Sequence, residues 1–220
     1  MPTQPMTRRR RATRAPKRRK RADGERSRQA ILQAAAEMAS VDGLEGLSLG
    51  ALAARLGISK SGLFAHFGSK QELEIATVEA AGQVFADDVM RPGLAAPPGV
   101  RRLVALSEAF LSHVERRVFP GGCFFAAAAA ELDSRCGPVR EPIAAFQREW
   151  MGTLERQAAE ARAQGEFDRL ADPKQIAFEV NAMLIAANGI FLLQGDPAVF
   201  DRARAGLLGI LERGASVTPA

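Results

Sequence analysis

The segment from Ser48 to Phe67, SLGALAARLGISKSGLFAHF, restricts the possible folds of this 220-residue chain more than any other stretch. Its first half places leucine and alanine at helical spacing, and Gly57 then interrupts the pattern. A second short helix should begin at once, because Ser59 can cap it and Leu63 lies four residues before Phe67 on one apolar face. Two short helices joined by a glycine that permits a positive φ form a helix-turn-helix.

The expected geometry of this motif leaves one polar face free. A small core of Leu52, Leu56, Ile58 and Leu63 fixes the crossing of the two helices, and Ala53 lets them approach closely. The outer face then carries the hydrogen-bond donors Ser59, Lys60, Ser61 and His66. Such donors suit phosphates and base edges in a DNA major groove. The alternative is a pair of ordinary bundle helices with a polar surface, which agrees less well with the turn and both apolar stripes.

Helices are also expected on both sides of the motif. Ser27 to Asp42 is amphipathic, and Ser69 to Glu72 has the spacing of a capping box that opens a fourth helix. With these flanks, GLFAHFGSKQEL from Gly62 to Leu73 resembles the recognition helix and the start of the fourth helix in the TetR family of bacterial repressors. The resemblance covers about Arg26 to Val78.

This resemblance implies an all-helical homodimer whose N-terminal domains bind a double-stranded DNA operator. Its C-terminal domains would bind each other and a small effector. The residues expected to contact DNA are Ser48, Ser59, Lys60, Ser61, Gly62, Phe64, His66 and Lys70. Ser48 opens a helix whose exposed amides can hold a phosphate, and Lys70 matches a lysine of the family motif. Phe64 stands where the family commonly has tyrosine, so one expected phosphate donor is missing.

Charge is distributed unevenly along the chain. Residues 1–21 hold ten of the 30 Lys and Arg and none of the 25 Asp and Glu, so the rest of the chain is net acidic. We expect residues 1–22 to be disordered, because like charges repel and no apolar pattern is present. Such an arm can follow a phosphate backbone or enter a minor groove. Composition is the alternative explanation, since arginine outnumbers lysine throughout the chain.

A proline- and glycine-rich break at 91–99 separates this region from longer helices. Those helices are expected over 100–118, 123–132, 139–164, from Pro173 onward, and over 197–213. The fold class is therefore all-α, a three-helix DNA-binding domain joined to a C-terminal helical bundle for dimerisation and effector binding. The expected divisions are an arm at 1–22, the helix-turn-helix domain at 23–68, a connecting helix at 69–90, the effector and dimerisation domain at 100–214, and a tail at 215–220.

Small residues recur four apart in each of the last two expected helices. Ala182 and Ala186 do so in one, and Ala205 and Gly209 in the other. Close packing of these helices against a symmetry-related copy would give a four-helix dimer interface. Packing within one chain explains the same spacing. We favour the homodimer, partly because one helix-turn-helix reads only half of a palindromic operator.

The family resemblance, rather than residue spacing, predicts an effector pocket between the bundle helices. Residues that could line a mainly apolar cavity are Phe110, His113, Phe124, Trp150, Leu154, Asn181 and Met183, with His113 or Asn181 orienting the ligand. Core packing explains each of them at least as well. Cys123 lies near a helix start and could be redox-active, but a buried structural role is the simpler interpretation.

Other classes of function find little support. The two histidines and two cysteines form no metal-ligand spacing, and no nucleophile motif or glycine-rich phosphate loop is present, so we expect no enzyme activity, metal or cofactor. Glu179, Asn181 and Asn188 interrupt the most apolar segment, which argues against a membrane span. The hypothesis is a cytoplasmic, ligand-responsive transcriptional repressor. The alternative is a nonspecific or nucleoid-associated DNA-binding protein that depends on the basic arm.

Overall fold

The computed structural model describes residues 16–215, and within that range all regular structure is helical. The predicted all-α fold is therefore confirmed. The elements in chain order are α1 (Pro16–Asp42), α2 (Leu49–Leu56), α3 (Lys60–Phe67), α4 (Lys70–Phe85), a π-helical turn η1 (Ala86–Met90), α5 (Arg91–Leu94), α6 (Val100–Glu115), α7 (Phe124–Leu132), α8 (Arg140–Ala163), α9 (Pro173–Gln194) and α10 (Ala198–Ala215).

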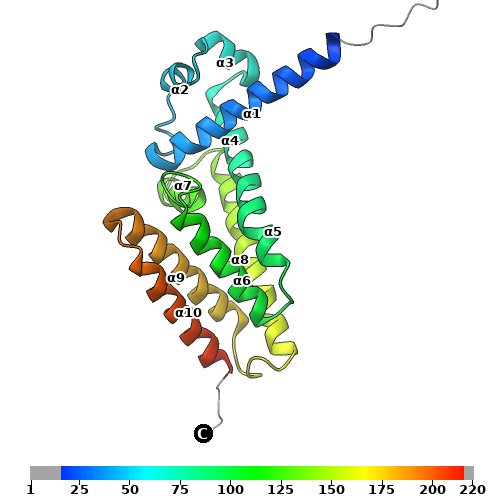
Figure 1. Cartoon of the computed structure of the whole chain (residues 1–220), viewed down its shortest axis with the longest axis vertical. Helices are drawn as coiled ribbons and strands as arrows, with labels where there is room; N and C mark the ends of the chain where they lie inside the picture. The colour runs from blue at the N-terminus through cyan, green and yellow to red at the C-terminus, as the bar shows by residue number, and fades with distance from the viewer. Residues whose placement is uncertain (1–15, 216–220) are drawn as a thin grey trace, which may run out of the picture.

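Helices α1, α2 and α3 form a head at one end of the molecule, above an elongated bundle (Figure 1). The head has its own small core, to which α4 also contributes, consisting mainly of Ile31, Leu32, Leu47, Leu52, Leu63, Phe67 and Leu73. A second, larger core fills the bundle, and α4 runs from the first core into the second. The head therefore sits on a helix that is also part of the bundle.

The first helix begins earlier than the sequence indicated. We expected it near Ser27, whereas α1 starts at Pro16, so residues 16–22 of the predicted disordered arm are helical. Proline suits the first turn of a helix, and lysine and arginine are good helix formers, which accounts for the extension. The rest of the predicted arm, residues 1–15, lies outside the described residues.

The helix after the motif continues beyond the predicted break. We expected it to end near Asp88, but α4, η1 and α5 follow one another without a gap as far as Leu94. In the wide π turn, the amide of Arg91 bonds to the carbonyl of Ala86, five residues back. Such a turn accommodates Pro92, which has no amide hydrogen to donate. Gly93 then packs directly on Leu106 of α6.

In the bundle, α9 packs against α6, α8 and α10. By length and composition α9 could cross a membrane, with a mean hydropathy of 1.8 over its most apolar window. Its buried side, which includes Ile176, Val180, Leu184 and Phe191, belongs to the bundle core. The apolar composition of α9 is therefore also explained by its central position in the bundle.

The other side of α9 is apolar but exposed. Phe178 is 61% exposed and Leu193 is 88% exposed. Between them, the same face carries further exposed apolar residues, which are Ala182, Ile185, Ala186, Gly189 and Ile190. On α10, Ala205 and Leu208 are exposed as well. The close contact between α9 and α10 instead uses Gly206, which faces Met183. Of the small residues singled out in the sequence, Ala182, Ala186 and Ala205 are therefore exposed in the single chain, whereas Gly209 is half-buried.

Candidate DNA-binding face and ligand cavity

The helix-turn-helix has the predicted caps and turn. The hydroxyl of Ser48 accepts a hydrogen bond from the amide of Ala51 at 3.4 Å, and that of Ser59 accepts one from Gly62 at 3.0 Å. Gly57 has φ +65°, and the following amide, of Ile58, bonds to the carbonyl of Ala53 at 3.0 Å. The left-handed turn ends α2 and lets α3 begin at Lys60, directly after the cap residue Ser59.

Helix α3 presents its polar side chains to solvent. Ser59, Lys60, Ser61 and His66 are all exposed, whereas Leu63 and Phe67 are buried in the head. Gly62 is half-buried, and a side chain there would crowd the hydroxyl of Ser59. The hydroxyls of Ser59 and Ser61 lie 3.0 Å apart. The face contains both donors and acceptors, which is what recognition of base edges and phosphates requires.

Gly50 brings two predicted contacts together and was not among the predicted site residues. A β-carbon at this position would lie 3.1 Å from Cε of Lys60 and 3.7 Å from Oγ of Ser48. Because glycine has no side chain, Lys60 can lie across the first turn of α2 beside Ser48. The sequence signal for this role, one glycine in the first turn of a helix, is too common to have identified it.

Two apolar residues of the motif are more exposed than a packing role requires. Ile58 was predicted to join the small core, but it is 37% exposed, because it lies on the turn rather than between the helices. Phe64 is 45% exposed on α3. Its ring has no hydrogen-bond donor, yet it lies on the same helix as the polar face and offers apolar contact area there.

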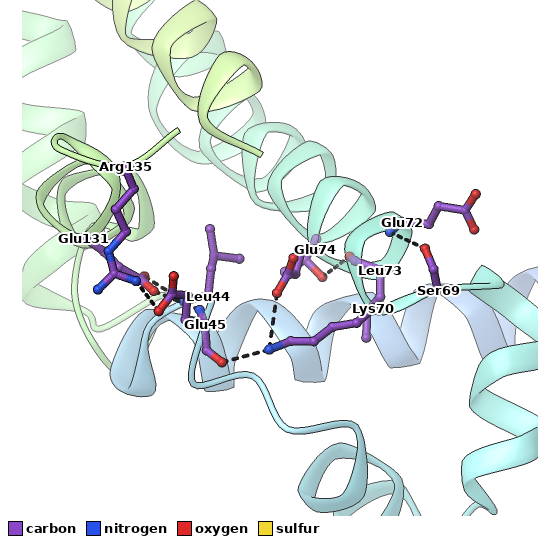
Figure 2. A network of polar contacts seen from close by, with 10 residues as sticks. Leu44, Glu45, Ser69, Lys70, Glu72, Leu73, Glu74, Glu131 and Arg135 are labelled. Carbon is purple, nitrogen blue, oxygen red and sulfur yellow. Dashed lines mark hydrogen bonds and ion pairs between the residues drawn. The ribbon is translucent and has the colours of Figure 1, made fainter. Parts of the chain in front are cut away.

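Lys70 is exposed, but its ammonium group already has partners within the chain. Its ammonium group donates to the carbonyl of Glu45 at 2.9 Å and lies 3.5 Å from the carboxylate of Glu74 (Figure 2). Burial raises the pKa of Glu74, and the nearby charge of Lys70 partly offsets that effect. In this structure, Lys70 ties the start of α4 to the segment between α1 and α2.

The same segment is held from the bundle side by Glu131 of α7. Its carboxylate accepts hydrogen bonds from the amides of Leu44 and Glu45 at 2.7 and 2.8 Å (Figure 2). Arg135, just after α7, pairs with the carboxylate of Glu45. That side-chain hydrogen bond holds the pKa of the Glu45 carboxyl below its usual value. This junction joins residues more than 80 positions apart, so no local sequence pattern predicts it.

A second contact between head and bundle involves Gly121, in the turn before α7. Its amide donates to the hydroxyl of Ser40 at 3.1 Å, and a β-carbon there would lie 1.8 Å from the Ser40 carbonyl oxygen. Two residues later, the amide of Cys123 donates to the side-chain oxygen of Asn188 on α9 at 2.9 Å. The end of α1 thus rests directly on the turn that begins α7.

A cavity of about 610 Å³ lies next to α7, between that helix and α4, α6, α8 and α9. Its aromatic wall consists of Phe85, Phe110, Phe125, Phe146, Trp150 and Phe178. Ala126, Ala129 and Ala130 of α7 also line it, so the alanine-rich sequence of this helix leaves space rather than filling it. A volume of this size suits a small-molecule ligand.

Three of the seven predicted pocket residues line this cavity: Phe110, Trp150 and Asn181. The indole N–H of Trp150 donates to the side-chain oxygen of Asn181 at 2.9 Å. The other four must be reassigned. Phe124 and Leu154 are at most 1% exposed in the bundle core, Met183 packs on α10, and His113 lies elsewhere. Helical spacing alone cannot separate cavity walls from core, because both are apolar stripes.

His113 is buried beside Phe85 and Phe119. Its Nδ1 lies 2.7 Å from the carboxylate of Asp88, which also accepts two hydrogen bonds from Arg116 at 2.7 and 2.8 Å. Burial lowers the pKa of His113, and the Asp88 carboxylate offsets this only in part. Burial opposes ionisation of Asp88, but hydrogen bonds from Arg116 and His113 outweigh it and lower the Asp88 pKa. Neutral His113 therefore stabilises the junction of η1 and α6.

Cys123 also lines the cavity, and it is 2% exposed. Burial raises the pKa of its thiol to about 11, against weaker opposing hydrogen bonds from the backbone of Ala126 and Phe125. A thiol with this pKa is protonated at neutral pH and is a poor nucleophile. The environment therefore supports the structural role and not the redox role.

Comparisons with known protein families match both parts of the chain. The family model described as "Bacterial regulatory proteins, tetR family" matches residues 31–77, which include the helix-turn-helix. The model described as "Tetracyclin repressor-like, C-terminal domain" matches residues 99–207 of the bundle. No curated protein matches the chain significantly.

Several solved structures share the fold. A TetR transcriptional regulator from Chloroflexus aurantiacus superimposes with a TM-score of 0.81 at 23% identity, covering 87% of this chain and 97% of that one. A TetR-family regulator from Cytophaga hutchinsonii superimposes with a TM-score of 0.77 at 22% identity, covering 89% of this chain and 98% of that one. The regulator AibR, in complex with isovaleryl coenzyme A and operator DNA, superimposes with a TM-score of 0.68 at 24% identity, covering 85% of this chain and 98% of that one.

The two family matches and the fold agree with the geometry of the head and the bundle. The head carries a capped recognition helix with an exposed polar face, and the bundle contains a cavity in contact with the head through α7. The chain belongs to the TetR family of transcriptional regulators, which are ligand-responsive DNA-binding proteins.

Proposed function

We propose that this protein is a cytoplasmic transcriptional repressor that binds a palindromic operator as a homodimer and is released by a small-molecule effector. The observation that carries the proposal is the exposed polar face of α3, with Lys60 beside Ser48 at the starts of two helices. Both helix starts offer unpaired amides to phosphates, and the side chains between them can reach base edges.

The exposed apolar side of α9 supports dimerisation through the last two helices. Large residues such as Phe178 and Leu193 leave water only if another surface covers them, and Ala182 and Ala186 allow a helix to approach closely. Ala205 adds a small exposed residue on α10. Two copies related by a two-fold axis would place two α3 helices for successive major grooves.

The basic N-terminal segment adds affinity in this proposal without selecting a sequence. Its ten Lys and Arg would neutralise phosphates and release counterions, so its contribution falls steeply with salt. Lys70 has a different role in this proposal from the phosphate contact that its sequence position indicated. Since its ammonium group is held by Glu45 and Glu74, it positions the segment before α2 rather than contacting a phosphate.

A ligand in the cavity can act on the head through α7. The same helix lines the cavity with Ala126 and Ala129 and holds the head through Glu131. A ligand that favours a different position of α7 would shift the head relative to the bundle. It would disfavour operator binding by its difference in affinity for the two arrangements.

Selection of bound sequences from a random pool of DNA duplexes tests the proposal. Full-length protein should enrich a two-fold symmetric site at near-physiological salt, whereas the double variant Lys60→Ala, His66→Ala should not. Lys174→Ala is the matched control, because Lys174 is exposed at the start of α9, away from the head. Salt-dependent binding by all three proteins without any enriched motif would instead support the nonspecific, arm-driven alternative.

A further inference from the structure

The ionisable residues around the cavity are all acidic. Asp133 lines the cavity itself, and a neighbouring cavity of about 340 Å³, which shares Phe85, Phe146 and Trp150 with it, is lined by Glu79 and Glu149. Among the described residues that line either cavity, none is lysine, arginine or histidine. The nearby Arg148 is paired with Glu141. The two cavities therefore present negative charge without a basic partner.

The other polar side chains that line the larger cavity are neutral, and they are Cys123, Gln147 and Asn181. Cys123 is a neutral thiol because of its burial, and the side-chain oxygen of Asn181 accepts the indole N–H of Trp150. Carboxylates and phosphates in proteins are usually held by arginine, lysine or clustered amides. An anionic ligand would have to leave water for a cavity whose lining residues include no arginine or lysine and only two side-chain amides, those of Gln147 and Asn181, which is unfavourable.

The aromatic wall favours the opposite charge. Ring faces of phenylalanine and tryptophan attract a cation electrostatically, most strongly where water is excluded. Neighbouring side chains cover most of Trp150 and Phe110, which are 5% and 2% exposed, so more of the ring surface open to the cavity comes from half-buried Phe146 and from Phe178, which is 61% exposed. The alanines of α7 leave room for a bulky ligand, and the exposed residues of α9 at the rim extend the apolar surface.

We infer that the cavity binds a lipophilic cation, an apolar or aromatic molecule that carries one positive charge. The inference rests on the proposed function, in which this cavity is the effector site, and it names the chemical class of the effector. Aromatic rings would surround the apolar body of the ligand, while Asp133 at the cavity wall and Glu149 in the neighbouring cavity would stabilise its charge.

The single tryptophan provides a direct assay. Trp150 is the only tryptophan of the chain and lies in the cavity wall, so its fluorescence reports on occupancy. Full-length protein is titrated with tetraphenylphosphonium and with tetraphenylborate, two ions of similar shape and opposite charge. Tetraphenylphosphonium should change the fluorescence in a saturable way and bind at least about tenfold more tightly than tetraphenylborate. Equal or tighter binding of tetraphenylborate would overturn the inference.

Variants separate the effect of charge on ligand binding from nonspecific hydrophobic binding. Glu149→Gln and Asp133→Asn should each weaken tetraphenylphosphonium binding by about three- to fivefold, as expected for removing one partly solvated charge near the ligand. Glu160→Gln removes the same charge from the same helix about 16 Å further along and should leave the affinity unchanged. Ala129→Phe fills the cavity and should abolish binding. An equal effect of all three acidic variants would mean that only net charge matters, against the inference.

Operator release is measured in parallel on the selected DNA site. Saturable binding of tetraphenylphosphonium at Trp150 without loss of operator affinity would support the ligand class and contradict effector-controlled release. Release by an anionic compound, with no cation binding in the cavity, would support the proposed function and overturn this inference. The two proposals therefore fail through different observations.

Discussion

Replacing Gly121 by alanine is a sharp test of the junction between head and bundle. The added β-carbon would lie 1.8 Å from the carbonyl oxygen of Ser40 and 2.3 Å from its carbonyl carbon. Both atoms belong to the backbone at the end of α1, so no side-chain rotation can relieve the contact. The turn before α7 and the end of α1 must move apart.

The size of the effect follows from three terms. Forcing atoms into a packed contact costs about 1–3 kcal/mol, and stretching the 3.1 Å hydrogen bond from Gly121 to Ser40 costs about 1 kcal/mol more. Alanine restricts the unfolded chain, which returns about 0.4–1 kcal/mol. The net loss of stability should be about 2 kcal/mol. For a chain of this size that lowers the melting temperature by about 4–8 °C.

Thermal and urea unfolding at a fixed protein concentration measure this loss, since the proposed dimerisation would make apparent stability depend on concentration. Gly24→Ala is the matched control, because a β-carbon at this position in α1 meets nothing within 4 Å. It should stabilise the protein by about 0.5–1 kcal/mol through helix propensity. If Gly121→Ala stays within about 0.5 kcal/mol of the unsubstituted protein, the close contact at the junction does not exist in solution.

Three further outcomes are expected. An alkylating reagent should modify exposed Cys136 in the folded protein and buried Cys123 only after denaturation. Mass spectrometry counts the adducts, and two adducts on the folded chain would contradict the burial and the raised pKa of Cys123. The pKa of His113 in the folded protein lies below its ordinary value of 6.5. As the pH falls through 6.5, the unfolded chain therefore binds a proton at His113 before the folded chain does. The free energy of unfolding should decrease there by at most about 1.4 kcal/mol per pH unit. His113→Gln should flatten that dependence in urea titrations, and an unchanged slope would refute the assignment. Lys70→Gln should destabilise the head through Glu45 without changing the salt dependence of operator binding, whereas a slope smaller by about one would restore Lys70 as a phosphate contact.

The geometry of the candidate DNA-binding face was predictable because its determinants are local. Ser48, Ser59 and Gly57 act within a few residues of themselves, through caps and a left-handed turn, so their spacing in the sequence already specifies the geometry. The presence of the main helices was predictable for the same reason. Helix ends were less so, since the π turn that carries the helix past Pro92 has no comparable local signal.

The cavity and the junction depend on contacts between distant residues. Phe110 and Phe124 both lie on apolar stripes, yet one lines the cavity and the other is enclosed in the core, and only the packing of five helices decides which. Glu131 looks like a surface residue of an alanine-rich helix. Its function as an acceptor for the amides of Leu44 and Glu45 appears only when α7 is placed beneath α1.

The outer side of α9 has a thermodynamic consequence. Phe178, Ala182, Ile185 and Ala186 line the cavity and also lie on the face that we propose pairs with a second copy. One surface would then serve two equilibria, ligand binding and subunit association. Mass action links such equilibria, so ligand affinity would depend on the total concentration of the chain in the cell. Synthesis of the regulator itself would thereby tune the ligand concentration to which the genes under its control respond.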